Sequence, residues 1–86
     1  MNALFDTLIR FSDDLKIAAL VLMDGCYVIT IKKTPEKYPG VAFFLECKDE
    51  DAQEQESYEC NAIYEVYNHI VNFIMESFEP ECWYYK

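Results

Sequence analysis

Residues 17–32 read IAALVLMDGCYVITIK, and this stretch decides the fold that the sequence predicts. An apolar run ends at Met23, and a second run, rich in β-branched residues, begins at Cys26. Between them, Asp24 and Gly25 tolerate positive φ angles and favour a two-residue type I′ turn between antiparallel strands. The stretch therefore predicts a β-hairpin in which Met23 lies opposite Cys26 and Leu22 lies opposite Tyr27.

The predicted hairpin has two faces, because side chains alternate along a strand. One face carries Leu20, Leu22 and Ile29 and is expected to meet the helices. The members of the other face are Val21, Met23, Cys26 and Val28. This second face is also largely apolar, which is unusual for the solvent side of a small sheet. We expect either a helix or another protein chain to cover it.

The remaining elements follow from apolar periodicity and turn residues. Residues 2–15 and 51–78 have helical spacing, 33–40 form a loop because they hold two prolines and a glycine, and 41–47 alternate as a third strand. Asp51 and Glu54 have capping-box spacing at the start of the second helix, although Ser57 could start a shorter helix instead. The chain is therefore predicted to be a single α+β domain over residues 1–86, with a three-stranded antiparallel meander flanked by an N-terminal helix and a long C-terminal helix.

The charge lies on one side of the sequence. Residues 1–45 hold five acidic and five basic residues, whereas residues 46–86 hold eleven acidic residues against Lys48 and Lys86, which accounts for the net charge of −9. Seven of the acids lie between Glu46 and Glu59. Because like charges repel and reduce stability, a small domain that keeps them is expected to use their field on a basic partner.

The predicted partner-binding residues combine the acidic run with one aromatic anchor. They are Glu46, Asp49, Glu50, Asp51, Glu54, Glu56, Tyr58 and Glu59. Lysine and arginine side chains that grip phosphate also grip carboxylate, so these acids can stand in for nucleic-acid phosphates. The competing interpretation is that the run is a solvated face that keeps the protein soluble.

Other chemistries receive little support from the residue pattern. His69 has Glu65 four residues before it but no evident nucleophile, so no catalytic residue is assigned and the protein is not expected to be an enzyme. The four cysteines contain no close pair of the kind that zinc sites use, and two glycines do not make a phosphate-binding loop. No metal and no cofactor are predicted, and direct nucleic-acid binding is disfavoured by the charge.

The sequence also predicts where the protein works. Asp6 and Arg10 interrupt the N-terminal apolar residues, so no signal peptide is expected, and no apolar stretch reaches the length of a membrane span. We expect a cytoplasmic protein that does not bind membranes, with most of its cysteines buried as free thiols.

In its length, acidity and predicted layout the chain resembles small phage-encoded inhibitors of bacterial defence, in particular anti-CRISPR proteins. One type of Cas9 inhibitor has a helix, a three-stranded antiparallel sheet and further helices, and uses acidic side chains to occupy the site that reads the protospacer-adjacent motif. The resemblance rests on no shared motif. It implies a non-enzymatic inhibitor in the host cell cytoplasm, which blocks a basic, nucleic-acid-binding cleft of a defence nuclease.

Two alternatives remain open. The same charges suit an immunity or antitoxin protein that inhibits a basic nuclease. A structural protein would instead form a homodimer through the second sheet face, and the residues assigned to this possible second interface are Val21, Met23, Cys26, Val28, Trp83 and Tyr85.

Overall fold

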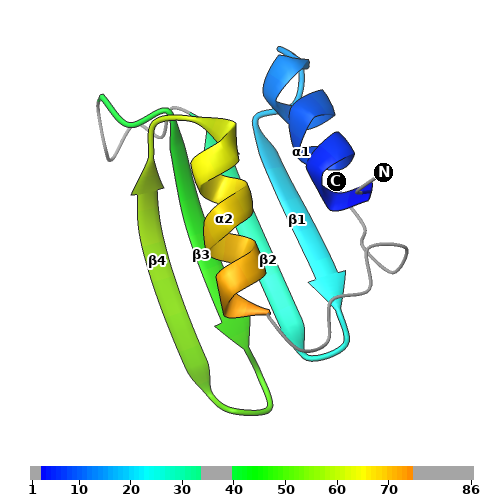
Figure 1. The fold of residues 1–86 in the computed structure, drawn as a ribbon, viewed down its shortest axis with the longest axis vertical. Helices are drawn as coiled ribbons and strands as arrows, with labels where there is room; N and C mark the ends of the chain where they lie inside the picture. The colour runs from blue at the N-terminus through cyan, green and yellow to red at the C-terminus, as the bar shows by residue number, and fades with distance from the viewer. Residues whose placement is uncertain (1–2, 34–39, 75–86) are drawn as a thin grey trace.

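The computed structural model describes residues 3–33 and 40–74. The elements along the chain are α1 (Ala3–Asp13), β1 (Ala19–Asp24), β2 (Tyr27–Lys33), β3 (Phe43–Asp49), β4 (Glu54–Cys60) and α2 (Ile63–Phe73). The strands pair antiparallel in the order β1-β2-β3-β4. The α+β class is confirmed, and Figure 1 shows both helices on one side of the sheet.

The prediction of three strands and a long C-terminal helix is wrong in part: the three strands and a C-terminal helix exist, but the sheet has a fourth strand and the helix begins later. Residues 54–60, expected to lie in the helix, form β4, and the Asp51–Glu54 capping box does not exist because residues 50–53 make a turn. A helix through residues 51–57 would present hardly any apolar side chain to the core. As a strand, the same segment pairs along its whole length with β3 and buries Cys60. Cross-strand pairing therefore outweighs the helical signal of the acidic residues.

The second helix is accordingly short. α2 begins at Ile63 and ends at Phe73, and it turns Val66 and Ile70 into the core. Glu65 reaches back so that one of its carboxylate oxygens accepts a hydrogen bond from the backbone N–H of Asn61, at 3.3 Å. This contact resembles half of a capping box, placed about ten residues later than the sequence predicted. The C-terminal part of the predicted helix, with Phe78, lies outside the described residues.

The hairpin of residues 17–32 is confirmed, but its register differs from the predicted one. Asp24 pairs with Tyr27 and Leu22 pairs with Ile29, so Gly25 and Cys26 form the turn. Gly25 has a φ of 60°, whereas Cys26 is not in the positive-φ region. Positive φ at the first turn position alone is typical of a type II′ turn, in which glycine is the preferred residue there. The predicted turn would have required Asp24 to adopt positive φ as well.

This change of register leaves the two faces of the hairpin intact. The partner of each residue moves by two positions, and side chains alternate with a period of two, so no side chain changes face. Leu20, Leu22, Ile29 and Ile31 are all fully buried against the helices, as predicted. The prediction of which side chains lie on each face of the hairpin is therefore correct, although the predicted turn residues are wrong.

A Gly25→Ala variant should be less stable by about 1–2 kcal/mol, because an L-residue with a side chain pays that much in the left-handed region. No atom lies within 4 Å of the added Cβ position, so the effect comes from backbone strain and not from a clash. Chemical denaturation would measure it. Gly25→Asn is the matched control, since asparagine tolerates positive φ and should lose less stability. Equal losses in the two variants would contradict the strain argument.

One core joins all six elements. Its strand residues are Leu20, Leu22, Ile29, Ile31, Phe43, Leu45, Cys47 and Cys60, and its helix and cap residues are Leu4, Leu8, Phe11, Val66, Ile70 and Ile74. Aromatic contacts add to it: the rings of Phe5 on α1 and Tyr67 on α2 meet edge to face at 5.2 Å and join the two helices, and the rings of Tyr27 on β2 and Phe73 on α2, at 6.1 Å, join the sheet to α2. The strand residues in this core all share one face, so the helices cover only that face of the sheet.

The end of α1 is fixed to the end of β2. The Lys33 ammonium donates a hydrogen bond to the backbone oxygen of Asp14 at 2.6 Å and lies 4.5 Å from the centre of the Phe11 ring. A cation near a helix C-terminus and over an aromatic face is favourable in both respects. Neither described helix has the length and apolar composition that crossing a membrane would require.

Candidate functional site

Two turns meet at one end of the sheet. The β1–β2 turn and the β3–β4 turn lie at the lower end in Figure 1, and the backbone N–H of Glu50 donates to the backbone oxygen of Cys26 at 2.9 Å. The sheet register also places Asp24, Tyr27, Asp49 and Glu54 in one row across all four strands. Together with the turn residues this row forms a surface that we call the acidic end. Its members are Asp24, Asp49, Glu50, Asp51 and Glu54.

The Asp49 carboxylate builds the β3–β4 turn. Its Oδ1 accepts hydrogen bonds from the backbone N–H groups of Asp51 and Ala52, both at 3.1 Å. The same carboxylate interacts with the Cys26 thiol, and that hydrogen bond is the main cause that raises the pKa of the thiol. Gln53 completes the turn at a φ of 58°, and its side chain donates to the Glu50 backbone oxygen at 3.1 Å. Asp49 is therefore a structural residue of the acidic end.

Three other acidic side chains of this end face outward. Glu50, Asp51 and Glu54 are exposed, and none of them forms an ion pair or a side-chain hydrogen bond with another described residue. Glu54 lies directly opposite Asp49 in the β3–β4 pair. Like charges in directly opposite positions of an antiparallel pair are destabilising. A shallow depression of about 270 Å³ lies among Lys48, Asp49, Glu50 and residues 53–55.

Tyr58 and Glu56 are engaged within the domain. The Tyr58 hydroxyl donates a hydrogen bond to a Glu56 carboxylate oxygen, which raises the pKa of Tyr58 to about 12. The Tyr58 ring stacks on the His69 ring of α2, with centroids 3.9 Å apart and an interplanar angle of 15°. One face of the predicted aromatic anchor is therefore already covered. The same contact gives His69 the boundary position between the core and the polar side of α2.

The structure does not bring all the predicted partner-binding residues together. Glu46 and Glu59 lie on the face of the sheet that the helices do not cover, because they alternate with the buried Leu45, Cys47 and Cys60. Asp49, Glu54, Glu56 and Tyr58 lie on the helix side, and Glu50 and Asp51 lie on the turn. Sequence reasoning missed Asp24, which joins the acidic end from the neutral half of the chain. In an antiparallel meander the third strand ends beside the first turn, and this was the signal that could have identified Asp24.

The possible second interface is also only partly assembled. Val21, Met23 and Val28 lie together on the uncovered sheet face, whereas Cys26 belongs to the turn. Trp83 and Tyr85 lie outside the described residues. Met23 is 44% exposed, and among the described strand residues it is the one large hydrophobic side chain that is exposed.

The buried thiols of Cys47 and Cys60 are unreactive at neutral pH. Burial raises the pKa of Cys47 to about 12 and that of Cys60 to about 11. Since the thiolate is the nucleophile and the metal ligand, both groups are held in their unreactive form at neutral pH. Among the described residues, no three His, Cys, Asp or Glu side chains gather as a metal site.

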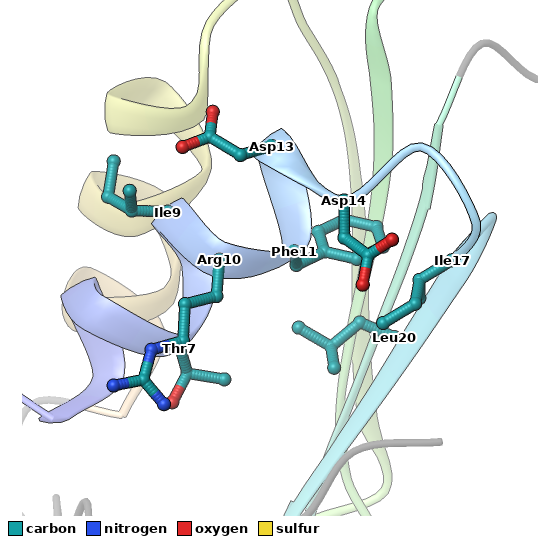
Figure 2. Close-up of a pocket in the computed structure, with 8 residues that line it drawn as sticks. All are labelled: Thr7, Ile9, Arg10, Phe11, Asp13, Asp14, Ile17 and Leu20. Atoms are coloured by element: carbon teal, nitrogen blue, oxygen red, sulfur yellow. The ribbon is translucent and has the colours of Figure 1, made fainter.

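A second cavity lies between α1 and the start of β1. Its volume is about 450 Å³, and Figure 2 shows Phe11, Asp14, Ile17 and Leu20 among the residues around it. Arg10 and Asp13 also line it. The sequence did not single out this place as a site, and its mainly apolar lining suits packing better than catalysis.

Comparison with known proteins gives this site no counterpart. No family model matches the chain, and neither a curated protein nor a solved structure is detectably similar to it.

Proposed function

We propose that the protein binds, without catalysis, a basic and nucleic-acid-binding surface of a partner protein through its acidic end. The observation that carries the proposal is the convergence of carboxylates from two hairpins. The row of Asp24, Asp49 and Glu54 spans the sheet, and the exposed Glu50 and Asp51 extend it at the turn.

The energetics of this end favour a cationic partner. Asp49 and Glu54 face each other across the β3–β4 pair, an arrangement that reduces the stability of the free protein. Lysine or arginine side chains of a partner would relieve this repulsion and form charge-assisted hydrogen bonds. Neighbouring strands are about 4.8 Å apart. Asp49 and Glu54 are therefore one strand spacing apart, whereas Asp24 lies two spacings from Asp49, with Tyr27 between them. Such a row can place carboxylates against the basic side chains of a cleft that normally holds phosphates.

The partner class that fits this chemistry is a nuclease of bacterial defence, inhibited by occupancy of its DNA-binding cleft in the host cell cytoplasm. The four-stranded sheet departs from the three-stranded layout on which the resemblance to anti-CRISPR proteins was drawn. The proposal is therefore supported by the charge distribution alone. An immunity or antitoxin protein against a basic nuclease would use the same surface, and the identity of the captured partner separates the two cases.

The charge-reversal variant Glu50→Lys/Glu54→Lys should bind the partner at least about 100-fold more weakly, because each change replaces an attraction with a repulsion. Both side chains are exposed, and Asp49 is left in place because the turn depends on it. The wild-type protein and the variant would first capture partners from bacterial lysates, with quantitative mass spectrometry. The captured nuclease would then be purified for titration and for DNA-cleavage assays.

The matched control is Asp6→Lys/Asp13→Lys, which makes the same change in net charge on α1. This control should retain most of the affinity, and wild-type binding should weaken steeply as salt increases. Equal losses in both variants would show that only the overall charge matters. Unchanged binding of Glu50→Lys/Glu54→Lys would refute the proposal.

A further inference from the structure

The outer edge of β1 is one of the two borders of the sheet. No strand in the described part of the chain pairs along it. The backbone N–H of Lys33 donates to the backbone oxygen of Ala18 at 3.0 Å, so the hydrogen-bonded pairs with β2 fall on the even-numbered residues of β1. The backbone groups of Ala19, Val21 and Met23 therefore point away from β2, along the border.

This border lacks the features that keep exposed strand edges from pairing. Natural sheets protect an edge with charged side chains, proline, a bulge or a covering segment. Residues 19–23 read ALVLM and hold neither a charge nor a proline, and their pairing with β2 is continuous. By contrast, β4 carries Glu54, Glu56 and Glu59. A covering segment is the means of protection that is left for β1.

The cavity between α1 and β1 lies next to this border. Its described lining comes from α1, from the connection after α1 and from β1, the outermost strand, so it does not lie under the middle of the sheet. Figure 2 shows the apolar side chains of Phe11, Ile17 and Leu20 around it. Its volume of about 450 Å³ is in the range that holds drug-sized molecules, so a bulky aromatic side chain fits.

The segment that follows α2 is long enough to reach both the border and the cavity. α2 runs toward the end of the sheet that carries the β1–β2 turn (Figure 1), where the ring of Phe73 contacts that of Tyr27. Residues 75–86 follow, and these twelve residues span at most about 40 Å when extended. The six residues of β1 take up roughly 20 Å of that length. The rest is available for the crossing from α2 to the border.

The path from α2 to this border also has the usual hand. A segment that follows β1 from the turn end is antiparallel to β1 and parallel to β4. Figure 1 shows α2 in front of the sheet, with β4 pointing upward at the left and β1 at the right. A crossover from β4 through α2 to a strand beyond β1 is therefore right-handed, as about 98% of parallel crossovers are.

We propose that residues 79–86 of the same chain cover the outer border of β1 as an antiparallel strand and place Trp83 in the cavity. This segment reads EPECWYYK, and its aromatic residues favour strands. Pro80 at its start is tolerated on an edge strand, and its charged residues would protect the new border in turn. The proposal is independent of the proposed function, since none of these residues belongs to the acidic end.

Hydrogen exchange of single β1 amides tests the proposal, with controls in the same strand. The amides of Leu20 and Leu22 bond to β2 and should exchange slowly in either case. We expect the amides of Ala19, Val21 and Met23 to be protected as well, whereas on a bare border they would exchange many-fold faster. NMR spectroscopy of the full chain at two protein concentrations would measure all five rates.

The fluorescence of Trp83 gives a second measurement, because it is the one tryptophan of the chain. In the folded protein its emission should be blue-shifted, and acrylamide should quench it several-fold less than in a synthetic peptide of residues 75–86. The variant Trp83→Ser should release the three odd-numbered amides of β1 and leave the two even-numbered ones protected. The matched control is Tyr64→Ser, which removes an aromatic side chain that is 61% exposed on α2 and should release none of them.

Each outcome decides for or against the covered border. Protection that is independent of concentration, lost in Trp83→Ser and kept in Tyr64→Ser supports the proposal. Fast exchange of the odd-numbered amides in the wild-type protein overturns it, as does a Trp83 that acrylamide quenches as readily as in the peptide. Protection that grows with protein concentration would show that a second copy covers the border, and equal losses in both variants would show a general loosening of the domain; either result also overturns the proposal.

Discussion

A Leu45→Ala variant should lose about 2–5 kcal/mol of unfolding free energy, out of the roughly 5–15 kcal/mol that small domains have. Leu45 is fully buried at the middle of β3, which is an inner strand of the sheet. Its removal leaves a cavity between the sheet and the helices, because neighbouring side chains relax only partly. For a domain of this size, each kcal/mol corresponds to roughly 4–8 °C in Tm. Chemical and thermal denaturation would both measure the loss.

The chain offers a matched control for this substitution. Leu15 lies in the connection between α1 and β1 and is 97% exposed, so Leu15→Ala makes the same chemical change without opening a cavity. Its free energy of unfolding should stay within about 0.5 kcal/mol of the wild-type value. Similar losses in the two variants would contradict the placement of Leu45 in the core.

The second large effect is expected in alkaline solution. The ordinary pKa of a cysteine thiol is 9.0 here, whereas burial raises the pKa of Cys47 to about 12 and that of Cys60 to about 11. At a pH between 9.0 and these raised pKa values, the two thiols have lost their protons in the unfolded chain but still hold them in the folded chain. Stability rises with pH only where the unfolded state binds more protons, so it must fall over this range. The ceiling is about 1.4 kcal/mol per pH unit for each thiol.

The free energy of unfolding should therefore decline from pH 9 towards pH 12, and Cys47→Ala should reduce the slope of that decline. Urea denaturation at closely spaced pH values would measure both slopes. Leu45→Ala is the control, since it lowers stability at every pH but leaves the slope unchanged. A Cys47→Ala protein with the wild-type slope would show that this thiol is not protected by the fold.

The hairpin of residues 17–32 could be predicted because local chemistry specifies it. Alternating apolar residues and a glycine turn define the strands and their faces, and both survive a shift of register. The residue that takes the first turn position is decided by backbone strain at Asp24 and Gly25, which the Asp-Gly signal alone does not resolve. The core face of this hairpin was therefore correct, although its pairing was not.

The segment 54–60 could not be assigned from its own residues. Its glutamates and glutamine are common in helices, and only Tyr58 and Cys60 hint at alternation. What makes it a strand is the free edge of β3, to which the turn at 50–53 returns the chain. This pairing depends on the tertiary structure and cannot be seen in the residues of the segment itself. The error also changed the predicted site, because a strand sends Glu54 and Glu59 to opposite faces of the sheet, and not into the single cluster that the sequence predicted.

The outer position of β4 has a consequence for crowded solutions. A strand at the border of a sheet presents unpaired backbone groups, on which other chains can extend the sheet into a fibre. On β4 any copy of the same strand would bring its own glutamates alongside Glu54, Glu56 and Glu59. Repulsion between these glutamates opposes the growth of a fibre from this border. The carboxylates therefore protect the free protein against edge-to-edge aggregation.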